Sequence, residues 1–443
     1  MIEALVLLFV FSIITLTFYQ VISVGTRYII FSKNRLGAIA IANEKMEIAR
    51  NLAYEDVGIA GGVVSGNIPQ EEDVLENGRN FHVRTIIQYE DDPHDGTLGG
   101  SPGDVAYKDY KTVKIIVSWN NGGADQGEVL VVSRFVPPGL ETVSFGDGIL
   151  SINVFSSQSD GAAVPQALVR VSNPDVGIDE TVETNDSGNV RLVGAKESIQ
   201  RYRLTVSKSG YETVSTFSPY PDTDYNPVDT HASVIGGEFN TANIDLNKTG
   251  SIHFQAVDHL GDPVQGLDYE ISGGRKLGTE PIDPFGDIYN ANIADTTDSN
   301  GEKNYPDLSP GEYSFKLSDS ESAYQLISTN PISPFQLAPE SELNLVVKVI
   351  DKNLTSLLAR IIDAESSEPI SGAEVKLTNP ELSYDTTVTT GDDGVAVFPA
   401  EEAPLIAGNY EMFVSAEGFQ DNNGEIEIIA GKANETAIAI MEN

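Results

Sequence analysis

The chain has 443 residues, which is about three times the length of an ordinary domain, so several domains are expected. Lys and Arg number 27 against 66 Asp and Glu, and the formal net charge of −39 excludes nucleic acid and other partners held through their phosphates. The chain has no Cys, which excludes disulfides, thiolate metal sites and cysteine nucleophiles. A content of 5 His, 40 Gly and 22 Pro is typical of a turn-rich β chain and argues against a His-based enzyme.

The beginning of the chain predicts a membrane-spanning helix. Residues 4–24 carry no formal charge, and at about 1.5 Å per residue they reach roughly 31 Å, which matches a bilayer core of about 30 Å. The alternative is a secretory signal peptide, for which Ala38-Ile39-Ala40 would be the cleavage site. Because this tripeptide follows the charged residues 33–35 and lies well beyond the apolar run, we favour an anchor that is not cleaved there.

The same helix is predicted to continue to residue 55. Between Arg27 and Ala53 the sequence has neither Pro nor a Gly cluster that would end it. This second half is amphipathic, so we expect it to leave the membrane and to cover a sheet. The apolar side is expected to consist of Ile39, Ala42, Met46 and Ala49.

Glu3 is a carboxylate at the edge of this uncharged span, where a charge is costly to bury and is usually retained for a partner. In an ordinary anchor it would lie in the interface without a role. The segment MIEALVLLFVFSIITLTFYQVIS, followed by a continuing helix and by AIANEKMEIARNLAYEDVG, resembles the N-terminal helix of type IV pilins and pseudopilins. The resemblance implies that Glu3 meets the free N-terminus of a neighbouring subunit during filament assembly. It also implies prepilin-type N-terminal methylation and a prepilin peptidase as a partner.

The sequence departs from that family at its start. The family's peptidase cuts after a Gly that ends a short basic leader, whereas here Met1 comes directly before Ile2-Glu3. We therefore expect that the sequence begins at an internal Met or lacks the processed stretch. Arg27, Lys33 and Arg35 follow the span, so the positive-inside rule applied to this sequence alone places the C-terminal side in the cytoplasm. A basic leader would reverse that orientation.

Period-two strands begin after Asp56. Three segments, 81–89, 111–119 and 129–135, each place alternate apolar side chains on one face. Three strands with one apolar face need a cover, and the amphipathic half of the helix can supply it. We therefore expect a pilin-like helix-on-sheet domain, with the helix at 1–55 and the β domain at 56–140.

An acidic loop, DDPHDGTLGGSPGD, lies between the first two of these strands. Its carboxylates could bind calcium through oxygen, or they could set turns in a solvated loop. We favour the turns because the ligand spacing is not fixed. Calcium is therefore the one cofactor considered, and no catalytic residue is expected. The weak calcium candidates are Asp91, Asp92, Asp95 and Asp104.

The rest of the chain repeats three landmarks in three β-sandwich modules, at 148–248, 249–351 and 354–443. The landmarks are a Pro-led strand, a tight hairpin that is entered by Thr and contains Gly, and a strand with an inward Tyr. The hairpins begin at Thr184, Thr297 and Thr390, and the tyrosines are Tyr202, Tyr313 and Tyr410. In the third module we expect Glu425–Ile429 to pair with Glu435–Met441.

This order of landmarks, with Gly210-Tyr211 and Gly418-Phe419 near the ends of the first and third modules, resembles carboxypeptidase regulatory-like and related immunoglobulin-like modules of bacterial surface proteins. The resemblance implies no peptidase chemistry, and no module clusters His with acids as a metallopeptidase would. The middle module lacks the final Gly-aromatic pair and carries extra sequence near Pro281 to Tyr289.

The sequence thus predicts an α+β chain, with a long N-terminal helix and a pilin-like antiparallel sheet followed by three all-β immunoglobulin-like sandwiches. We expect a structural subunit, a minor or tip pilin or pseudopilin of a type IV pilus-like filament, with other subunits and the membrane as partners of the helix. It would be a single-pass inner-membrane protein before assembly and extracellular afterwards. The alternative is a permanently anchored adhesin or carbohydrate-binding surface protein, and an enzyme has no group of residues to support it.

Overall fold

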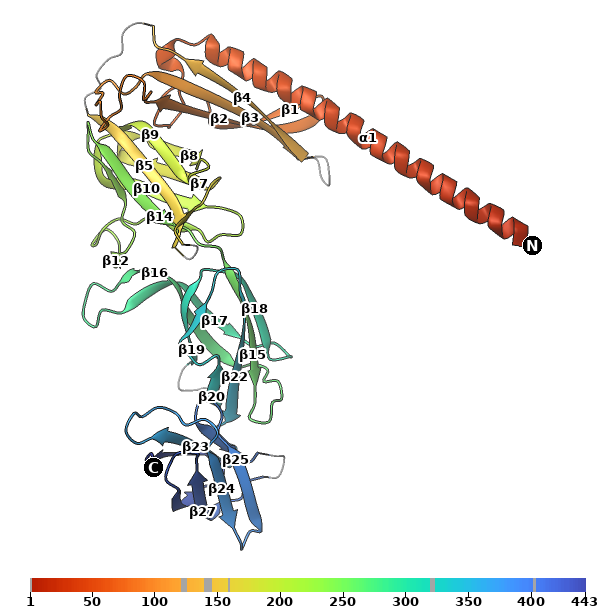
Figure 1. Ribbon diagram of the computed structural model, residues 1–443, viewed down its shortest axis with the longest axis vertical. Helices are drawn as coiled ribbons and strands as arrows, with labels where there is room; N and C mark the ends of the chain where they lie inside the picture. Colours follow the sequence, from red (N-terminus) through yellow and green to blue (C-terminus); the bar gives the residue numbers. More distant parts are fainter. Residues whose placement is uncertain (1, 121–125, 139–145, 158–159, 319–322, 401–403) are drawn as a thin grey trace. The chain divides into compact units, whose positions relative to one another are not determined.

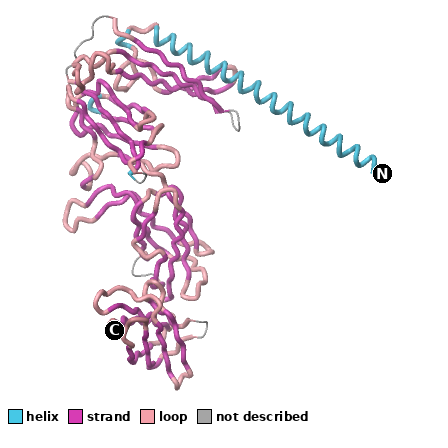
Figure 2. Tube along the Cα trace, viewed as in Figure 1, coloured by secondary structure: helices cyan, strands magenta, loops and turns pink. Residues whose placement is uncertain are grey.

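The computed structural model describes residues 2–120, 126–138, 146–157, 160–318, 323–400 and 404–443 (Figure 1). A single long helix comes first, and β-strands make up nearly all of the remaining regular structure (Figure 2). The described residues form two compact units. Unit 1 comprises Met1–Lys208, Thr213–Thr223 and Asp229–Leu246, and unit 2 comprises Ser209–Glu212, Asp224–Val228 and Asn247–Asn443.

Helix α1 runs without interruption from Ile2 to Arg50, close to the predicted extent, and a single turn of 3-10 helix, η1, follows at Tyr54–Asp56. By length and composition, the segment Leu7–Arg50 could cross a membrane, with a mean hydropathy of 2.1 in its most apolar window. Residues 7–29 of α1 are almost all exposed, whereas the second half of the helix lies on a sheet. The helix therefore has two different surfaces in succession.

The sheet under α1 has four antiparallel strands in the order β1-β2-β3-β4. The sequence predicted only three, because the acidic segment EEDVLE of β1 has little strand propensity. It pairs with β2, from Glu71 opposite Arg84 to Glu76 opposite Arg79, and is an edge strand of the sheet. Its acidic side chains disfavour pairing of this edge with a strand of another chain. The bounds are β1 (Glu71–Glu76), β2 (Arg79–Glu90), β3 (Tyr110–Asn120) and β4 (Gln126–Phe135).

The helix and this sheet share one hydrophobic core. The predicted inward residues of β2 and β3 are buried, except Tyr89, which is half-buried. Trp119 contacts the helix through Phe31, with ring centroids 5.6 Å apart. The helical stripe is rotated slightly from the prediction, because Ile39 is only half-buried while Ala38 and Ile41 are buried at its centre. The buried apolar side chains of the helix are Ala38, Ile41, Ala42, Met46 and Ala49.

The first sandwich belongs to unit 1. One sheet has β5 at its centre, flanked by β14, β6 and β9, and the other has the path β11-β10-β7-β8 with β13 attached to β10. The bounds are β5 (Asp147–Ser156), β6 (Ala162–Ala163), β7 (Leu168–Asn173), β8 (Ile178–Glu183), β9 (Asn189–Lys196), β10 (Ser198–Ser207), β11 (Val214–Ser215), β13 (Ala232–Val234) and β14 (Phe239–Asp245), with the 3-10 turn η3 at Pro174–Val176.

The second sandwich belongs to unit 2, with sheets β18-β15-β22-β20 and β12-β16-β19-β21, to which β17 adds through β16. Strand β12 (Asn226–Pro227) lies within the range expected for the first module, yet it pairs with β16. The other bounds are β15 (Gly250–Val257), β16 (Asp268–Thr279), β17 (Asp287–Thr296), β18 (Glu302–Leu308), β19 (Gly311–Leu317), β20 (Tyr324–Asn330), β21 (Phe335–Leu337) and β22 (Glu342–Asp351).

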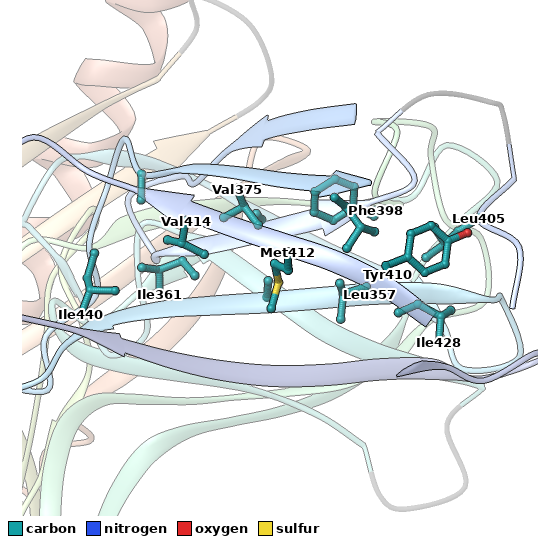
Figure 3. Close-up of a cluster of buried hydrophobic side chains, with 14 of the residues drawn as sticks. Leu357, Ile361, Val375, Phe398, Leu405, Tyr410, Met412, Val414, Ile428 and Ile440 are labelled. Carbon is teal, nitrogen blue, oxygen red and sulfur yellow. The ribbon is translucent and has the colours of Figure 1, made fainter. Parts of the chain in front are cut away.

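The third sandwich packs sheet β26-β23-β29 against sheet β25-β24-β27-β28 around a core that includes Phe398, Tyr410 and Met412 (Figure 3). The expected pairing of Glu425–Ile429 with Glu435–Met441 is wrong. Strand β28 pairs with β27, and β29 runs parallel to β23 in the other sheet. The bounds are β23 (Ser356–Asp363), β24 (Glu374–Asn379), β25 (Tyr384–Thr389), β26 (Val395–Phe398), β27 (Gly408–Ser415), β28 (Asn422–Ile428) and β29 (Ala433–Ile440).

The three sandwiches repeat the same internal contacts. In each one the first strand pairs in parallel with a late strand: β5 with β14, β15 with β22, and β23 with β29. In each one the buried tyrosine hydroxyl donates to a main-chain oxygen four to six residues earlier, as Tyr410 does to Ile406 over 2.7 Å. The sequence landmarks therefore mark equivalent positions of one fold, the middle module included.

The Thr that enters each hairpin joins two landmarks. Thr390 is buried, its Oγ1 donates to the oxygen of Ile370 over 2.7 Å, and it accepts from the nitrogen of Ala373 over 2.9 Å. Thr184 and Thr297 make the same two bonds in their modules. Because both bonded groups belong to the Pro-led segment, the hydroxyl fixes the hairpin against the neighbouring strand.

Candidate functional site

The exposed first half of α1 is an apolar surface that nothing in the described chain covers. Leu7, Phe9 and Ile14 are 72%, 67% and 60% exposed. Three of its aliphatic hydroxyl groups are bonded within the helix, because Ser12, Thr15 and Thr17 each donate to the main-chain oxygen four residues earlier. A segment with large exposed apolar side chains and internally bonded polar groups is suited to a bilayer or to a bundle of similar helices.

Glu3 lies in the first turn of α1, at the end of this apolar surface, and its side chain is exposed. A carboxylate in the first turn also lies at the positive end of the helix dipole. The predicted pairing of Glu3 with a neighbouring subunit concerns the assembled filament. It therefore stays a prediction.

The other end of α1 is fixed to the sheet by a buried lysine. The Lys111 ammonium of β3 donates to the oxygens of Tyr54 and Val57, each over 2.7 Å, and lies 4.5 Å from the centre of the Tyr54 ring. Burial lowers the pKa of Lys111 to about 8, against the nearby carboxylates of Glu55 and Asp56, which raise it. The lysine thus holds the turn that follows the helix.

Two further polar contacts hold the helix along its length. Asn34, in the middle of α1, is buried and accepts a hydrogen bond from Arg79 at the beginning of β2. Lys45 forms an ion pair of 2.7 Å with Glu72 of β1. Together with the packing of Phe31 on Trp119, these contacts attach α1 to the sheet beyond the uncharged segment that ends at Val24.

Within unit 1, the first sandwich is joined to the helix-on-sheet part through the edge strand β8. The nitrogen of Asp179 donates to the oxygen of Gly61 over 2.7 Å. The amide of Gln70 accepts from the nitrogen of Thr181 and donates to its oxygen. Main-chain groups that an edge strand would leave open to another chain are therefore bonded within unit 1.

A buried carboxylate lies at this junction. Glu180 occupies an inward position of β8 between Ile178 and Val182, and it is only 2% exposed. Its Oε2 accepts from the nitrogen of Val63 over 2.9 Å, while its Oε1 has no hydrogen-bond partner among the described residues. Burial raises the pKa of Glu180 to about 7, and the bond from Val63 acts in the opposite direction. The contact between β8 and the loop that contains Val63 is therefore sensitive to the charge of Glu180.

Two of the four candidate calcium residues, Asp92 and Asp104, are arranged as turn formers. Asp92 accepts from the nitrogen of His94, and Asp104 accepts from the nitrogen of Ala106, each two residues ahead. Asp91 is buried and accepts from Leu98, and burial raises its pKa, with Asp104 and Asp95 adding to the shift. Across the described residues, no three His, Asp or Glu side chains come close enough to hold a metal ion.

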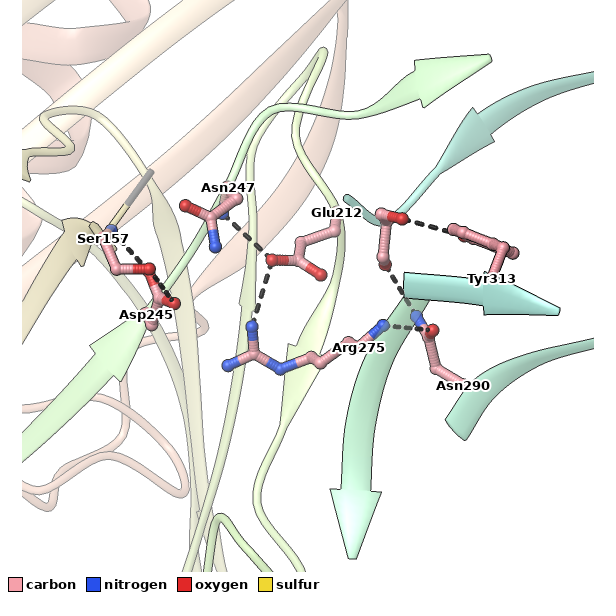
Figure 4. A network of polar contacts seen from close by, with 8 residues as sticks. Ser157, Glu212, Asp245, Asn247, Arg275, Asn290 and Tyr313 are labelled. Carbon is pink, nitrogen blue, oxygen red and sulfur yellow. Dashed lines mark hydrogen bonds and ion pairs between the residues drawn. The ribbon is translucent and has the colours of Figure 1, made fainter. Parts of the chain in front are cut away.

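Unit 2 also contains a buried charge, which forms an ion pair. Glu212 is 2% exposed in its side chain, lies 3.0 Å from Arg275 and accepts from the nitrogen of Asn247 (Figure 4). The network continues from Arg275 through Asn290 to Ser309. A pair that is excluded from water and bonded on several sides mainly fixes geometry, because its desolvation offsets much of the attraction.

The sequence reasoning missed Lys111, Glu180 and Glu212. For two of them the sequence does contain a signal. Lys111 begins the inward row that continues with Val113 and Ile115, and Glu180 stands in an apolar row of β8. A charge in an inward row indicates a buried group with a specific partner. Their partners are far away in the chain, and only the fold identifies them.

A comparison with protein families identifies two of the modules. Residues 151–247 and 356–441 match the carboxypeptidase regulatory-like domain family, which confirms the resemblance stated for the first and third modules. The middle module, which lacks a landmark, is outside the match. The family match does not extend to the N-terminal helix, so its pilin-like character stays a prediction. No curated protein sequence matches the chain.

Solved structures give distant similarities. The Bacillus anthracis TIE protein shows 14% identity with a TM-score of 0.20 and covers 85% of this chain and 76% of its own. The streptococcal ancillary pilin shows 13% identity with a TM-score of 0.20 over 67% of this chain and 99% of its own. The minor pilin GBS52 of Streptococcus agalactiae shows 13% identity with a TM-score of 0.19, and the alignment covers 44% of this chain and 97% of the pilin chain. At such TM-scores these similarities carry no argument for function.

Proposed function

We propose that the chain is a structural subunit of a type IV pilus-like filament, which its helix anchors in the membrane before assembly and which displays the three sandwiches outside. The observation that supports this proposal is the division of α1 into two surfaces. One half is uncharged and almost entirely exposed from Leu7 to Val24, and the other half packs on a sheet from Phe31 onward. A plain membrane anchor does not need its helix to continue as the cover of a folded domain.

The proposal gives the exposed half of α1 two successive surroundings. In the membrane, lipid covers Leu7, Phe9 and the other exposed side chains, and in a filament the same side chains would pack against helices of other subunits. The partners are therefore subunits with a similar helix. The size of the part outside the membrane favours a minor or tip subunit, since the chain from residue 56 onward would crowd a repeating lattice.

The contacts that hold α1 to the sheet support a role in which the helix is pulled. Lys111 and Arg79 attach two points of the helical part to strands β3 and β2. The bonds on β8 attach the sheet in turn to the first sandwich. A force applied to the helix would thus pass into folded structure through buried hydrogen bonds.

Replacement of Glu3 tests this proposal. Glu3→Ala should leave membrane insertion unchanged, because the apolar span is intact, and should reduce recovery of the chain in sheared filaments by about tenfold, because the amine of a neighbour loses its partner. Glu47→Ala is the matched control, since Glu47 is an exposed acid on the second half of the same helix. Equal recovery of both variants would contradict the role of Glu3. Wild-type chain that remains in the membrane when filaments are sheared off would favour the permanently anchored adhesin.

A further inference from the structure

The outer face of the third sandwich carries a groove that the proposed function does not use. It lies on the sheet β25-β24-β27-β28 and has a volume of about 510 Å³. Six side chains form its polar and aromatic lining: Lys376, Thr378, Glu411, Phe413, Asn423 and Glu425.

An exposed aromatic ring lies in this groove. The inward row of β27 is formed by Tyr410, Met412 and Val414, which build the core, whereas Phe413 points away from the core and is 41% exposed. The strands with the equivalent tyrosines carry polar residues at this position, three after the tyrosine: Thr205 in the first module and Lys316 in the second. Packing of the sandwich therefore does not require an aromatic residue here.

The strand register surrounds Phe413 with hydrogen-bonding groups. Lys376 of β24 lies directly opposite it on one side, and Asn423 of β28 lies opposite it on the other. On the same face, Glu411 is paired directly with Glu425. Two carboxylates in opposite positions of neighbouring strands destabilise a sheet, so stability alone does not account for the pair.

We propose that this groove binds a neutral oligosaccharide. The Phe413 ring offers a flat apolar surface to the C–H face of a sugar ring. Glu411 and Glu425 accept hydrogen bonds from sugar hydroxyls, which relieves their mutual repulsion, while Lys376 and Asn423 donate. A few polar groups of both kinds around one aromatic ring are typical of a site for a polar, uncharged ligand.

The charges around the groove exclude anionic ligands. Anionic glycans and nucleic acids meet the two carboxylates and a chain of net charge −39. The Lys376 ammonium is paired with Asp385 of β25 over 3.0 Å, so it does not repel a cation, and a hexalysine peptide is therefore one of the probes. A neutral polyhydroxyl ligand meets no repulsion.

This site goes beyond the proposed function and does not depend on it, because binding is measured on the purified full-length chain. The probes are the hexasaccharides of maltose, cellulose, mannan, xylan and chitin type, titrated by isothermal calorimetry in a detergent without a sugar headgroup. We expect at least one of them to bind with a Kd below about 1 mM. Phe413→Ala should weaken this binding at least about tenfold. Ile429→Ala, which changes a 51% exposed side chain of the same module outside the groove, should leave it unchanged.

Three results would overturn the proposal. The first is the absence of binding by every hexasaccharide up to about 10 mM. The second is equal binding by the Phe413→Ala and wild-type chains, with both folded as judged by thermal unfolding. The third is preferential binding of a hexalysine peptide or an alginate hexamer that Phe413→Ala abolishes, since this would assign the groove to a charged ligand.

Discussion

The Nζ of Lys111 lies 2.7 Å from the main-chain oxygen of Tyr54, so a buried ammonium of the sheet closes the turn that ends the long helix. The same group reaches the oxygen of Val57 and lies against the Tyr54 ring. Lys111 thus binds two residues that lie 57 and 54 positions earlier in the chain. It connects the part of the molecule that can enter a membrane with the part that folds in water.

Lys111→Met should remove a pH dependence of this domain. The pKa of Lys111 is about 8 in the folded chain and has an ordinary value of 10.5, so between pH 8 and 10 the unfolded chain binds more protons and stability rises with pH. The rise should reach about 2 kcal/mol in the wild type and vanish in the variant, which should also lose about 1–3 kcal/mol because two buried oxygens lose their donor.

The single Trp makes this measurable, because Trp119 lies in the core between α1 and the sheet and its fluorescence reports unfolding there. Lys45→Met is the control, as it removes a lysine of the helix whose ion pair is partly exposed. Identical pH profiles for the Lys111→Met and wild-type chains would show that the ammonium does not titrate in this range.

Glu180→Gln should strengthen the junction on β8 above neutral pH. The pKa of Glu180 is raised from 4.5 to about 7, so the stability associated with its protonated form is fully present below pH 4.5 and is lost as the pH rises through 7. At pH 8 the variant should therefore be more stable than the wild type by up to about 3 kcal/mol, and at pH 5 the two should be similar. Protection of the Val63 and Asp179 amides from hydrogen exchange measures this difference, with both chains compared at each pH.

Glu183→Gln is the control for that experiment, because Glu183 belongs to the same strand and its partner Arg84 is 3.5 Å away at the partly exposed rim. If Glu180→Gln weakens protection at pH 8, the ionised carboxylate stabilises the junction. The predicted direction of the effect on stability would then be wrong.

Thr390→Val should destabilise the third sandwich by about 1–3 kcal/mol, because the nearly isosteric side chain leaves the buried Ala373 nitrogen and Ile370 oxygen without their partners. Thr389→Val is the control, since Thr389 is the exposed neighbour. Differential scanning calorimetry of the full chain should show a lower transition temperature for Thr390→Val only. A neutral effect would show that the hydroxyl merely fills space.

Gly394→Ala should be more damaging than Gly418→Ala in the same module. Both glycines have positive φ, +68° and +87°, which an alanine adopts at a cost of about 1 kcal/mol. A Cβ at Gly394 would also lie 2.6 Å from the oxygen of Ile361, whereas one at Gly418 meets nothing within 4 Å. Calorimetry should therefore show a difference of at least about 2 kcal/mol between the two variants, and equal effects would contradict the close approach.

Much of the architecture could be predicted from the sequence, because it follows from local patterns. The alternation of apolar residues in β2 and β3 predicted which side chains face the core. The absence of Pro and of Gly clusters predicted the length of α1. The repeated Thr, Gly and Tyr gave three modules and the family of two of them. Each of these features depends on residues that are neighbours in the chain.

The features that were missed depend on distant partners. Strand β1 is acidic and becomes a strand only through its pairing with β2. The strands β28 and β29 are adjacent in the chain and were expected to pair, but β29 crosses to the other sheet and lies beside β23. Lys111 and Glu180 are buried by segments 54 and 117 residues away, so their own surroundings in the sequence do not identify their contacts.

The proposed function can be tested most directly by the location of the full-length wild-type chain after filaments are sheared from cells and freed of membranes. Quantitative mass spectrometry of both fractions should find the chain in the filaments, in smaller amounts than the main subunit and with peptides of the exposed helical segment Leu7–Ile29 present. Full-length chain found only in the membrane fraction, with filaments that lack it, would contradict the account.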